Sequence, residues 1–178
     1  MPRHNIILTG FMGTGKTTLG RLLAKRIDYD FVDTDTLIEE QTGLSIAKLF
    51  ETRGETAFRK LEADLVEDLA LKEGQVLATG GGLVLNPHNV KVLAATGHII
   101  CLTAAPEDIL ARVSQQQNLR PLLSEKDPQT KINELLRQRD TVYKQFPQLS
   151  TSAQTLEQLI DKLLKLIDAL PSPGAVSL

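Results

Sequence analysis

The feature that most constrains this chain is the segment Gly10–Thr17, Gly-Phe-Met-Gly-Thr-Gly-Lys-Thr, which fits the pattern G-x-x-x-x-G-K-[ST]. A short apolar run, Ile6-Ile7-Leu8, precedes it, and a stretch of helix-forming residues begins at Lys16. A short apolar run that breaks into glycines is typical of a buried parallel strand. The pattern therefore lies between a strand and a helix, which is the context that a phosphate-binding loop requires.

Each residue type in this phosphate loop (Gly10–Thr17) has a physical role. Glycines let backbone N–H groups turn inward around phosphate oxygens, and the following helix adds the positive end of its dipole. We expect Lys16 to reach the β- and γ-phosphates of ATP and the Thr17 hydroxyl to bind Mg²⁺. The predicted ATP-binding residues here are Gly13, Thr14, Gly15, Lys16, Thr17 and Thr18. The alternative is an ordinary glycine-rich turn.

Strand-like and helix-like segments alternate along the rest of the chain. Further strands are expected at about 31–32, 75–79, 98–103 and near 149. Helices are expected at about 46–50, 55–71, from 106, at 129–145 and at 156–169. This alternation predicts an α/β fold, a three-layer α/β/α arrangement with a central parallel sheet of five strands. We expect one domain over residues 1–170 and a flexible tail over 171–178.

The composition limits the partners that this chain is expected to have. Twenty Lys and Arg residues face 22 Asp and Glu, giving a net charge of −2, whereas nucleic-acid binders usually show a clustered basic excess. No apolar run approaches a membrane span, and the N-terminus resembles neither a signal peptide nor a transit segment. We therefore expect a soluble cytoplasmic protein with no nucleic-acid or membrane partner. The aromatic content of 4% indicates no large association surface, so a monomer is expected.

Cysteine and histidine are not expected to supply chemistry. Cys101 lies in an apolar run, which favours a buried core thiol over a nucleophile. The three histidines, His4, His88 and His98, are scattered and lack the spacing of metal ligands, so we interpret them as structural or surface residues.

Three predicted strands end in polar or glycine-rich segments, at 10–15, 33–35 and 80–82. In open parallel sheets, ligands bind beyond the carboxyl ends of the strands. We therefore expect these three segments to converge on one site.

Two carboxylates, Asp33 and Asp35, follow the second strand. If the strand continues, they point the same way and repel each other, unless a cation or hydroxyl donors lie between them. Asp33 is predicted to hold Mg²⁺ through water, and Asp35 to bind a substrate hydroxyl and take its proton. The alternative is that Thr34 or Asp35 caps a helix that begins at Thr36.

Two patterns of other nucleotide-binding proteins are missing from the sequence. The fourth predicted strand carries no acid, and there is no Asn-Lys-x-Asp segment of the kind that binds guanine. Both features favour a small-molecule kinase over a GTPase.

Several segments, in order, resemble shikimate kinase over roughly residues 5–168. They are the phosphate loop, Phe31–Asp35, Phe58–Glu62, Gly80–Gly82, Arg120–Leu123, and Arg139 four residues before Tyr143. The resemblance implies a fold like that of nucleoside-monophosphate kinases, with a substrate-binding segment at about 33–62 and a mobile lid at about 113–126. It implies transfer of the ATP γ-phosphate to the 3-hydroxyl of shikimate, a step of aromatic amino-acid (chorismate) biosynthesis.

The resemblance also implies roles for individual residues. Asp35 would bind the ring hydroxyls of shikimate, Arg59 and Arg139 its carboxylate, and Gly80, Gly81 and Gly82 would contact the substrate. Arg120 would reach the transferring phosphate from the lid and act with Lys16 and Asp35 in catalysis. Arg112 and Gln154 would contact adenine. Arg59 and Arg139 suit the binding of a carboxylate because a guanidinium group can bind a carboxylate with two parallel hydrogen bonds. Glu62, one turn after Arg59, can orient the Arg59 guanidinium.

Two rival functions stay open at this level. A gluconate or nucleoside-monophosphate kinase could use the same scaffold, and gluconate is also a hydroxylated carboxylate. A nucleotide-binding regulator without catalysis is the second rival. The intact set Lys16, Thr17, Asp33, Asp35 and Arg120 argues against the regulator.

Overall fold

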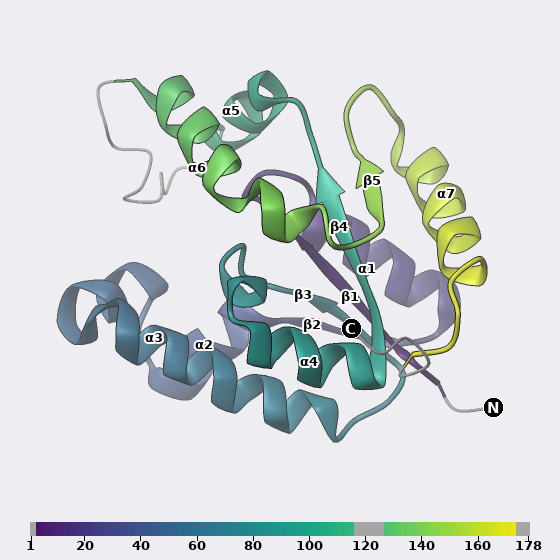
Figure 1. Cartoon of the computed structure of the whole chain (residues 1–178), viewed down its shortest axis with the longest axis horizontal. Coiled ribbons are helices and arrows are strands. Elements are labelled where there is room, and N and C mark those ends of the chain that lie inside the picture. Colours follow the sequence, from purple (N-terminus) through teal and green to yellow (C-terminus); the bar gives the residue numbers. More distant parts are fainter. Residues whose placement is uncertain (1–2, 116–126, 174–178) are drawn as a thin grey trace.

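A five-stranded parallel sheet forms the centre of the computed structural model, which describes residues 3–115 and 127–173 (Figure 1). The strands lie side by side in the order β2-β3-β1-β4-β5, and every neighbouring pair is parallel. Their bounds are β1 Asn5–Gly10, β2 Asp30–Asp33, β3 Gln75–Ala78, β4 Gly97–Thr103 and β5 Gln148–Ser150. The predicted α/β class and the five-stranded parallel sheet are confirmed.

The helices cover both faces of this sheet (Figure 1). Their bounds are α1 Lys16–Ile27, α2 Thr34–Thr42, α3 Ile46–Ala70, the 3-10 helix η1 Leu83–Leu85, α4 Pro87–Thr96, α5 Pro106–Ser114, α6 Pro128–Tyr143 and α7 Leu156–Asp168. Sequence reasoning did not predict η1 or α4. A start signal was nevertheless present, because Asn86 accepts a hydrogen bond from the His88 N–H and Pro87 occupies the first helical turn.

Alternate strand residues point to opposite faces of the sheet and build two hydrophobic layers. One face packs against α3, α4, α5 and α6 through Ile7, Leu77, Ile99 and Cys101. The other packs against α1 and α7 through Ile6, Leu8, Val76, Ile100 and Leu102. Burial raises the pKa of Cys101 to about 11, which confirms a core thiol instead of a reactive one.

Helix α3 combines the two helices that were expected at 46–50 and 55–71. Gly54 joins them with a backbone φ of 76°, a conformation that favours glycine, and it kinks the helix there. The hydroxyl of Ser45 accepts from the Lys48 N–H and caps the first part. The second part carries Arg59 and Glu62 along the edge of the sheet where β3 ends.

The strand order brings together the segments 10–15, 33–35 and 80–82, which were expected to form one site. Because β3 lies between β2 and β1, the carboxyl ends of these three strands are neighbours. Thr79 N–H, just beyond β3, donates to the carbonyl of Leu8 in β1 at 3.0 Å. The predicted convergence is therefore confirmed, and the reason is the crossover that inserts β3 between the first two strands.

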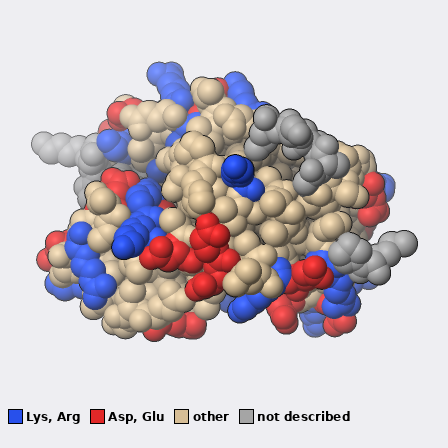
Figure 2. Space-filling view, turned by 60° about the horizontal axis from the view of Figure 1, so that its bottom comes forward, with Lys and Arg blue, Asp and Glu red and all other residues tan. Residues whose placement is uncertain are grey.

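Some expectations fall outside the part of the chain that the structure describes. Arg120 and most of the lid expected at 113–126 belong to residues 116–126, and the end of the expected tail belongs to 174–178. Within the described ranges, none of the helices combines the length and the apolar character needed to cross a bilayer. On the face drawn in Figure 2, acidic and basic side chains lie side by side in several groups, in keeping with the net charge of −2.

Candidate active site

The phosphate loop curls around the ammonium group of Lys16. Lys16 Nζ donates to the carbonyl oxygens of Gly10 and Phe11 at 2.9 and 2.8 Å. Gly13 and Gly15 have φ values of 74° and 90°, which turn the loop through conformations that side chains disfavour. Gly15 stands just before α1 and brings no side chain to cap it, so the first-turn N–H groups face the site where an anion would bind.

The Asp33 carboxylate links the end of β2 to both α1 and α2. Its Oδ2 accepts from the Thr17 hydroxyl at 2.8 Å, and its Oδ1 accepts from the N–H groups of Asp35 and Thr36 at 3.1 and 3.3 Å. Asp33 is thus the N-cap of α2, which begins at Thr34. The strand therefore does not continue to Asp35, and the alternative of a helix cap at Thr34 or Asp35 was wrong, because Asp33 is the cap. The two carboxylates differ in direction because the chain turns into a helix between them.

Asp35 lies in the first turn of α2 and approaches the glycine loop (Gly80–Gly82) that follows β3. A Cβ atom at Gly80 would lie 2.7 Å from Asp35 Oδ1, so only glycine permits this approach. The N–H of Gly80 donates to the Thr34 hydroxyl at 3.0 Å, which ties the same loop to α2. A carboxylate in the first turn of a helix is stabilised by the helix dipole.

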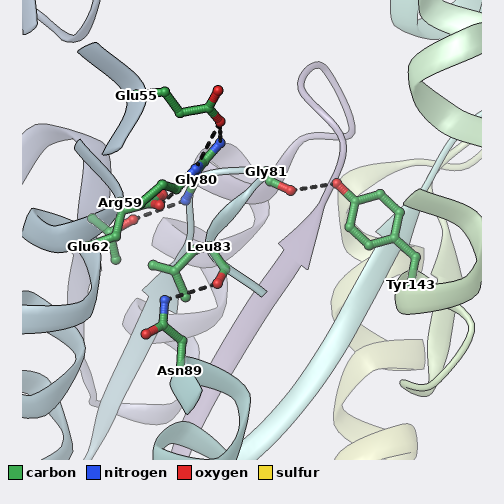
Figure 3. A network of polar contacts seen from close by, with 9 residues as sticks. Glu55, Arg59, Glu62, Gly80, Gly81, Leu83, Asn89 and Tyr143 are labelled. Atoms are coloured by element: carbon green, nitrogen blue, oxygen red, sulfur yellow. Dashed lines mark hydrogen bonds and ion pairs between the residues drawn. The ribbon is translucent and has the colours of Figure 1, made fainter. Parts of the chain in front are cut away.

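Arg59 reaches the other end of the glycine loop from α3 (Figure 3). Its Nη1 donates to Glu62 Oε2 at 2.7 Å, and its Nε and Nη2 donate to Glu55 Oε1 at 3.2 and 2.9 Å. A Cβ at Gly82 would lie only 2.5 and 2.6 Å from the two terminal nitrogens, so the guanidinium packs directly on that glycine. Arg59 is therefore held in one orientation from two sides.

The charges of this ion pair are perturbed by burial. Glu62 is 1% exposed, and desolvation raises its pKa, while the hydrogen bond and charge of Arg59 oppose that rise. Burial would lower the pKa of Arg59, but its bonds to Glu62 and Glu55 outweigh this effect and leave the pKa raised. The guanidinium consequently stays charged at any physiological pH. Burial of Glu62 was not predicted from the sequence, although its orienting role was.

Arg139 and Tyr143 approach the middle of the glycine loop from α6. A Cβ at Gly81 would lie 3.2 Å from Arg139 Nη1 and 3.2 Å from the Gly10 carbonyl oxygen. The Tyr143 hydroxyl donates to the carbonyl of Gly81 at 2.7 Å. The guanidinium carbon of Arg139 lies 5.4 Å from the centre of the Phe11 ring. Arg59 and Arg139 therefore flank one short loop that also contacts the phosphate loop.

Arg112 and Gln154 lie on the opposite flank of the phosphate loop, toward β4 and β5. Arg112 Nη1 donates to the Gly13 carbonyl and the Thr151 hydroxyl at 3.1 and 3.0 Å. Gln154, three residues after Thr151, donates from Nε2 to the Ser150 carbonyl at 2.7 Å. The sequence did not predict that Arg112 would hold the phosphate loop itself.

The two remaining residues of the predicted ATP-binding set are Thr14, in the phosphate loop, and Thr18, in α1. Thr14 is buried and its hydroxyl donates to the Phe11 carbonyl at 2.8 Å, which closes the phosphate loop. Thr18 is exposed on α1. Sequence reasoning missed the contacts that Tyr143 and Thr34 make to the glycine loop. The spacing of four residues between Arg139 and Tyr143 was the available signal, because it places both on one helix face.

Comparisons with known proteins agree with this arrangement. A family model described as "Shikimate kinase" matches residues 12–168. A curated relative named shikimate kinase, from Caldanaerobacter subterraneus subsp. tengcongensis, is 44% identical over 162 residues, which cover 90% of this chain and 94% of the relative. The solved structure of shikimate kinase from Acinetobacter baumannii in complex with shikimate has a TM-score of 0.87 and 36% identity, over 95% of this chain and 96% of that one. A gluconokinase from Sinorhizobium meliloti, 17% identical over 93% of this chain and 94% of its own, has a TM-score of 0.56 and shares the fold alone.

Proposed function

This chain belongs to the shikimate kinase family, and we propose that the site at the ends of β1, β2 and β3 transfers the γ-phosphate of ATP to the 3-hydroxyl of shikimate, giving 3-phosphoshikimate and ADP. The observation that carries this assignment is the glycine loop, against which Asp35, Arg59 and Arg139 pack from three different helices. The same loop borders Gly10 of the phosphate loop, so an acceptor bound there lies next to the phosphates.

The acceptor is held between charged groups of opposite sign. Arg59 and Arg139 bind its carboxylate, because two guanidinium groups can each present paired N–H donors to one anion. Asp35 accepts hydrogen bonds from the ring hydroxyls on the far side of the same loop. A ring with several hydroxyls and one carboxylate matches a site with two guanidinium groups on one side and a carboxylate on the other. The solved complex of the Acinetobacter relative with shikimate supports this choice of acceptor.

The phosphate loop and α1 bind the nucleotide. Lys16 exchanges its bonds to the Gly10 and Phe11 carbonyls for bonds to the β- and γ-phosphates. Arg112 and Gln154 contact adenine on the flank toward β5. Arg112 bonds to Gly13 of the phosphate loop, and Gln154 bonds to Ser150 at the end of β5. These positions support binding of the adenine base on that flank.

Thr17 and Asp33 are the residues that would hold Mg²⁺. Their oxygens lie 2.8 Å apart beside the phosphate loop, and oxygen ligands of this kind are the ones that Mg²⁺ prefers. Thr17 would bind the ion directly and Asp33 through water. When bound, the ion neutralises charge on the phosphates during transfer.

Asp35 takes the proton of the attacking hydroxyl as the phosphoryl group moves. Its position in the first turn of α2, where its carboxylate approaches Gly80, supports this role. Arg120 remains assigned, by the family resemblance, to stabilising the transferring phosphate from the lid at about 113–126. Exclusion of water by such a lid limits ATP hydrolysis, because water is the competing nucleophile. We also propose that the protein is a monomer, with one domain over residues 1–170 and a substrate-binding segment at about 33–62.

The test is a coupled assay of ADP release with shikimate, gluconate and AMP as separate acceptors. We expect turnover with shikimate to exceed that with either other acceptor by at least about 10²-fold, because the two arginines and Asp35 would be left unmatched by the wrong acceptor. Preferential turnover of gluconate or AMP would overturn the assignment. ADP release at background level with all three, while ATP binds, would favour a regulator.

A further inference from the structure

The hydroxyl of Tyr143 makes a contact to the glycine loop that the proposed reaction does not yet use. It donates to the carbonyl oxygen of Gly81, the central residue of the loop, at 2.7 Å (Figure 3). The side chain is 6% exposed, so little water competes for either group. Burial raises the pKa of Tyr143, with Arg139 acting in the opposite direction, and the phenol stays a donor throughout the neutral range.

Side chains from three helices hold the glycine loop and Leu83, the residue that follows it. Thr34 of α2 accepts from the Gly80 N–H at 3.0 Å, Tyr143 of α6 donates to the Gly81 carbonyl, and Asn89 of α4 donates to the Leu83 carbonyl at 3.0 Å. Three successive glycines impose few limits on their own torsion angles. The carbonyls of Gly80 and Gly82 accept backbone hydrogen bonds from the N–H groups of Leu83 and Leu85, each at 3.1 Å. The central carbonyl, that of Gly81, instead accepts the side-chain hydrogen bond from Tyr143.

Fixing this carbonyl also fixes the next amide. The peptide unit between Gly81 and Gly82 is planar and trans, so the Gly82 N–H points opposite to the Gly81 C=O. Tyr143 and Arg59 lie on opposite sides of the loop (Figure 3). The Gly82 N–H is thereby directed away from α6, toward the side where Arg59 packs on Gly82.

The same helix face supplies one of the two arginines. Arg139 precedes Tyr143 by four residues, and its Nη1 would lie 3.2 Å from a Cβ at Gly81. A shift of Gly81 would therefore change the space available to Arg139 as well as the direction of the Gly82 amide. Both groups border the position proposed for the acceptor.

We propose that Tyr143 is a positioning residue for the acceptor: its hydroxyl holds the glycine loop in the orientation that, together with Arg139 and Arg59, binds the substrate carboxylate. This inference rests on the proposed function, because the acceptor is the one assigned there. Tyr143 itself need not touch the substrate.

The test compares Tyr143→Phe with Tyr29→Phe in the full chain. The protein has only two tyrosines, so the control makes the same chemical change on the other flank of the sheet, where Tyr29 packs against Arg3. For Tyr143→Phe we expect Kd and KM for shikimate to rise about tenfold, the equivalent of about 1.4 kcal/mol. We expect KM for ATP to change less than twofold in both variants, and shikimate affinity to stay unchanged in Tyr29→Phe.

A second measurement needs no turnover. Hydrogen exchange of a peptide spanning 79–85 in the ligand-free protein should be faster in Tyr143→Phe than in wild type and unchanged in Tyr29→Phe. Shikimate affinity within twofold of wild type, or equal losses for shikimate and ATP, would overturn the proposal. Failure of the function itself is recognised separately, because wild-type protein would then show no preference for shikimate.

Discussion

The Thr17 hydroxyl donates to the Asp33 carboxylate across 2.8 Å, and this bond joins the first turn of α1 to the end of β2. It links a residue of the phosphate loop to one that lies sixteen positions later. Asp33 simultaneously caps α2 with its other oxygen, so a single carboxylate orients the helix that carries Asp35 and faces the proposed metal position.

Replacing Thr17 by Val should lower kcat by about 10² to 10³, because it removes the hydroxyl that would bind Mg²⁺ beside the transferring phosphate. The Mg²⁺ concentration needed for half-maximal rate should rise. Steady-state assays across a magnesium series provide the measurement. The matched control is Thr52→Val on the exposed side of α3, which should behave as wild type. An unchanged magnesium requirement in Thr17→Val would contradict the proposed ligand.

Replacing Asp35 by Asn should nearly abolish phosphorylation, with a loss of about 10³ or more, because the amide cannot take the hydroxyl proton. ATP binding should be retained, since the phosphate loop is untouched. Isothermal titration with ATP and the ADP-release assay separate the two effects. Asp30→Asn, exposed at the start of β2, is the control. Near-normal turnover in Asp35→Asn would refute the assignment of the acceptor hydroxyl.

Replacing Arg59 by Ala should nearly abolish phosphorylation and also make stability depend more strongly on pH than in the wild type. Arg59 lowers the pKa of buried Glu62, so its removal lets desolvation raise that pKa further above the ordinary value of 4.5. A carboxyl with a raised folded-state pKa binds more protons folded than unfolded, so stability falls as pH rises from about 4.5 through that raised pKa. The loss in the free energy of unfolding, measured as the difference between Arg59→Ala and wild type, should be larger at pH 8 than at pH 4 by roughly 1–3 kcal/mol.

Denaturant titrations of the Arg59→Ala protein at the two pH values measure this effect. The control for the pH effect is the double variant Arg59→Ala with Glu62→Gln, in which the extra loss at pH 8 should disappear. A pH-independent loss in the single variant would show that Glu62 does not carry the effect.

Replacing Gly82 by Ala should weaken shikimate binding by on the order of 10²-fold, because the new methyl would displace the Arg59 guanidinium. The backbone of Gly82, at φ −99°, accepts alanine without strain, so the contact alone is tested. ATP affinity should change less than twofold. Fluorescence or calorimetric titration with each ligand checks both statements. Equal shikimate affinity in wild type and variant would mean that Arg59 does not hold the carboxylate.

Much of the architecture was predictable because it depends on local chemistry. The phosphate loop could be placed between β1 and α1 from its glycines, Lys16 and Thr17 alone. The apolar run around Cys101 identified a buried strand, and the helix expected at 46–50 begins where α3 begins. Helix α4 was not predicted, although Asn86 and Pro87 mark its beginning.

Other features depend on contacts between distant residues. The direction of Asp33 and Asp35 follows from where β2 ends, which is set by its pairing with β3 instead of by the residues themselves. The burial of Glu62 depends on how the kinked α3 lies against the glycine loop. The bond of Arg112 to Gly13 joins residues 99 positions apart, and periodicity carries no information about such a pair.

The sequence alone indicated the phosphate loop, the five strands and most of the helices, and the residue types that an anionic, hydroxylated acceptor requires, because these depend on patterns within a few residues. Tertiary structure alone decided that Arg112 bonds to the phosphate loop, that Asp33 caps a helix while bonding Thr17, and that Tyr143 bonds to Gly81. Those relationships arise when β3 inserts between β2 and β1 and when helices from both halves of the chain pack on the same strand ends.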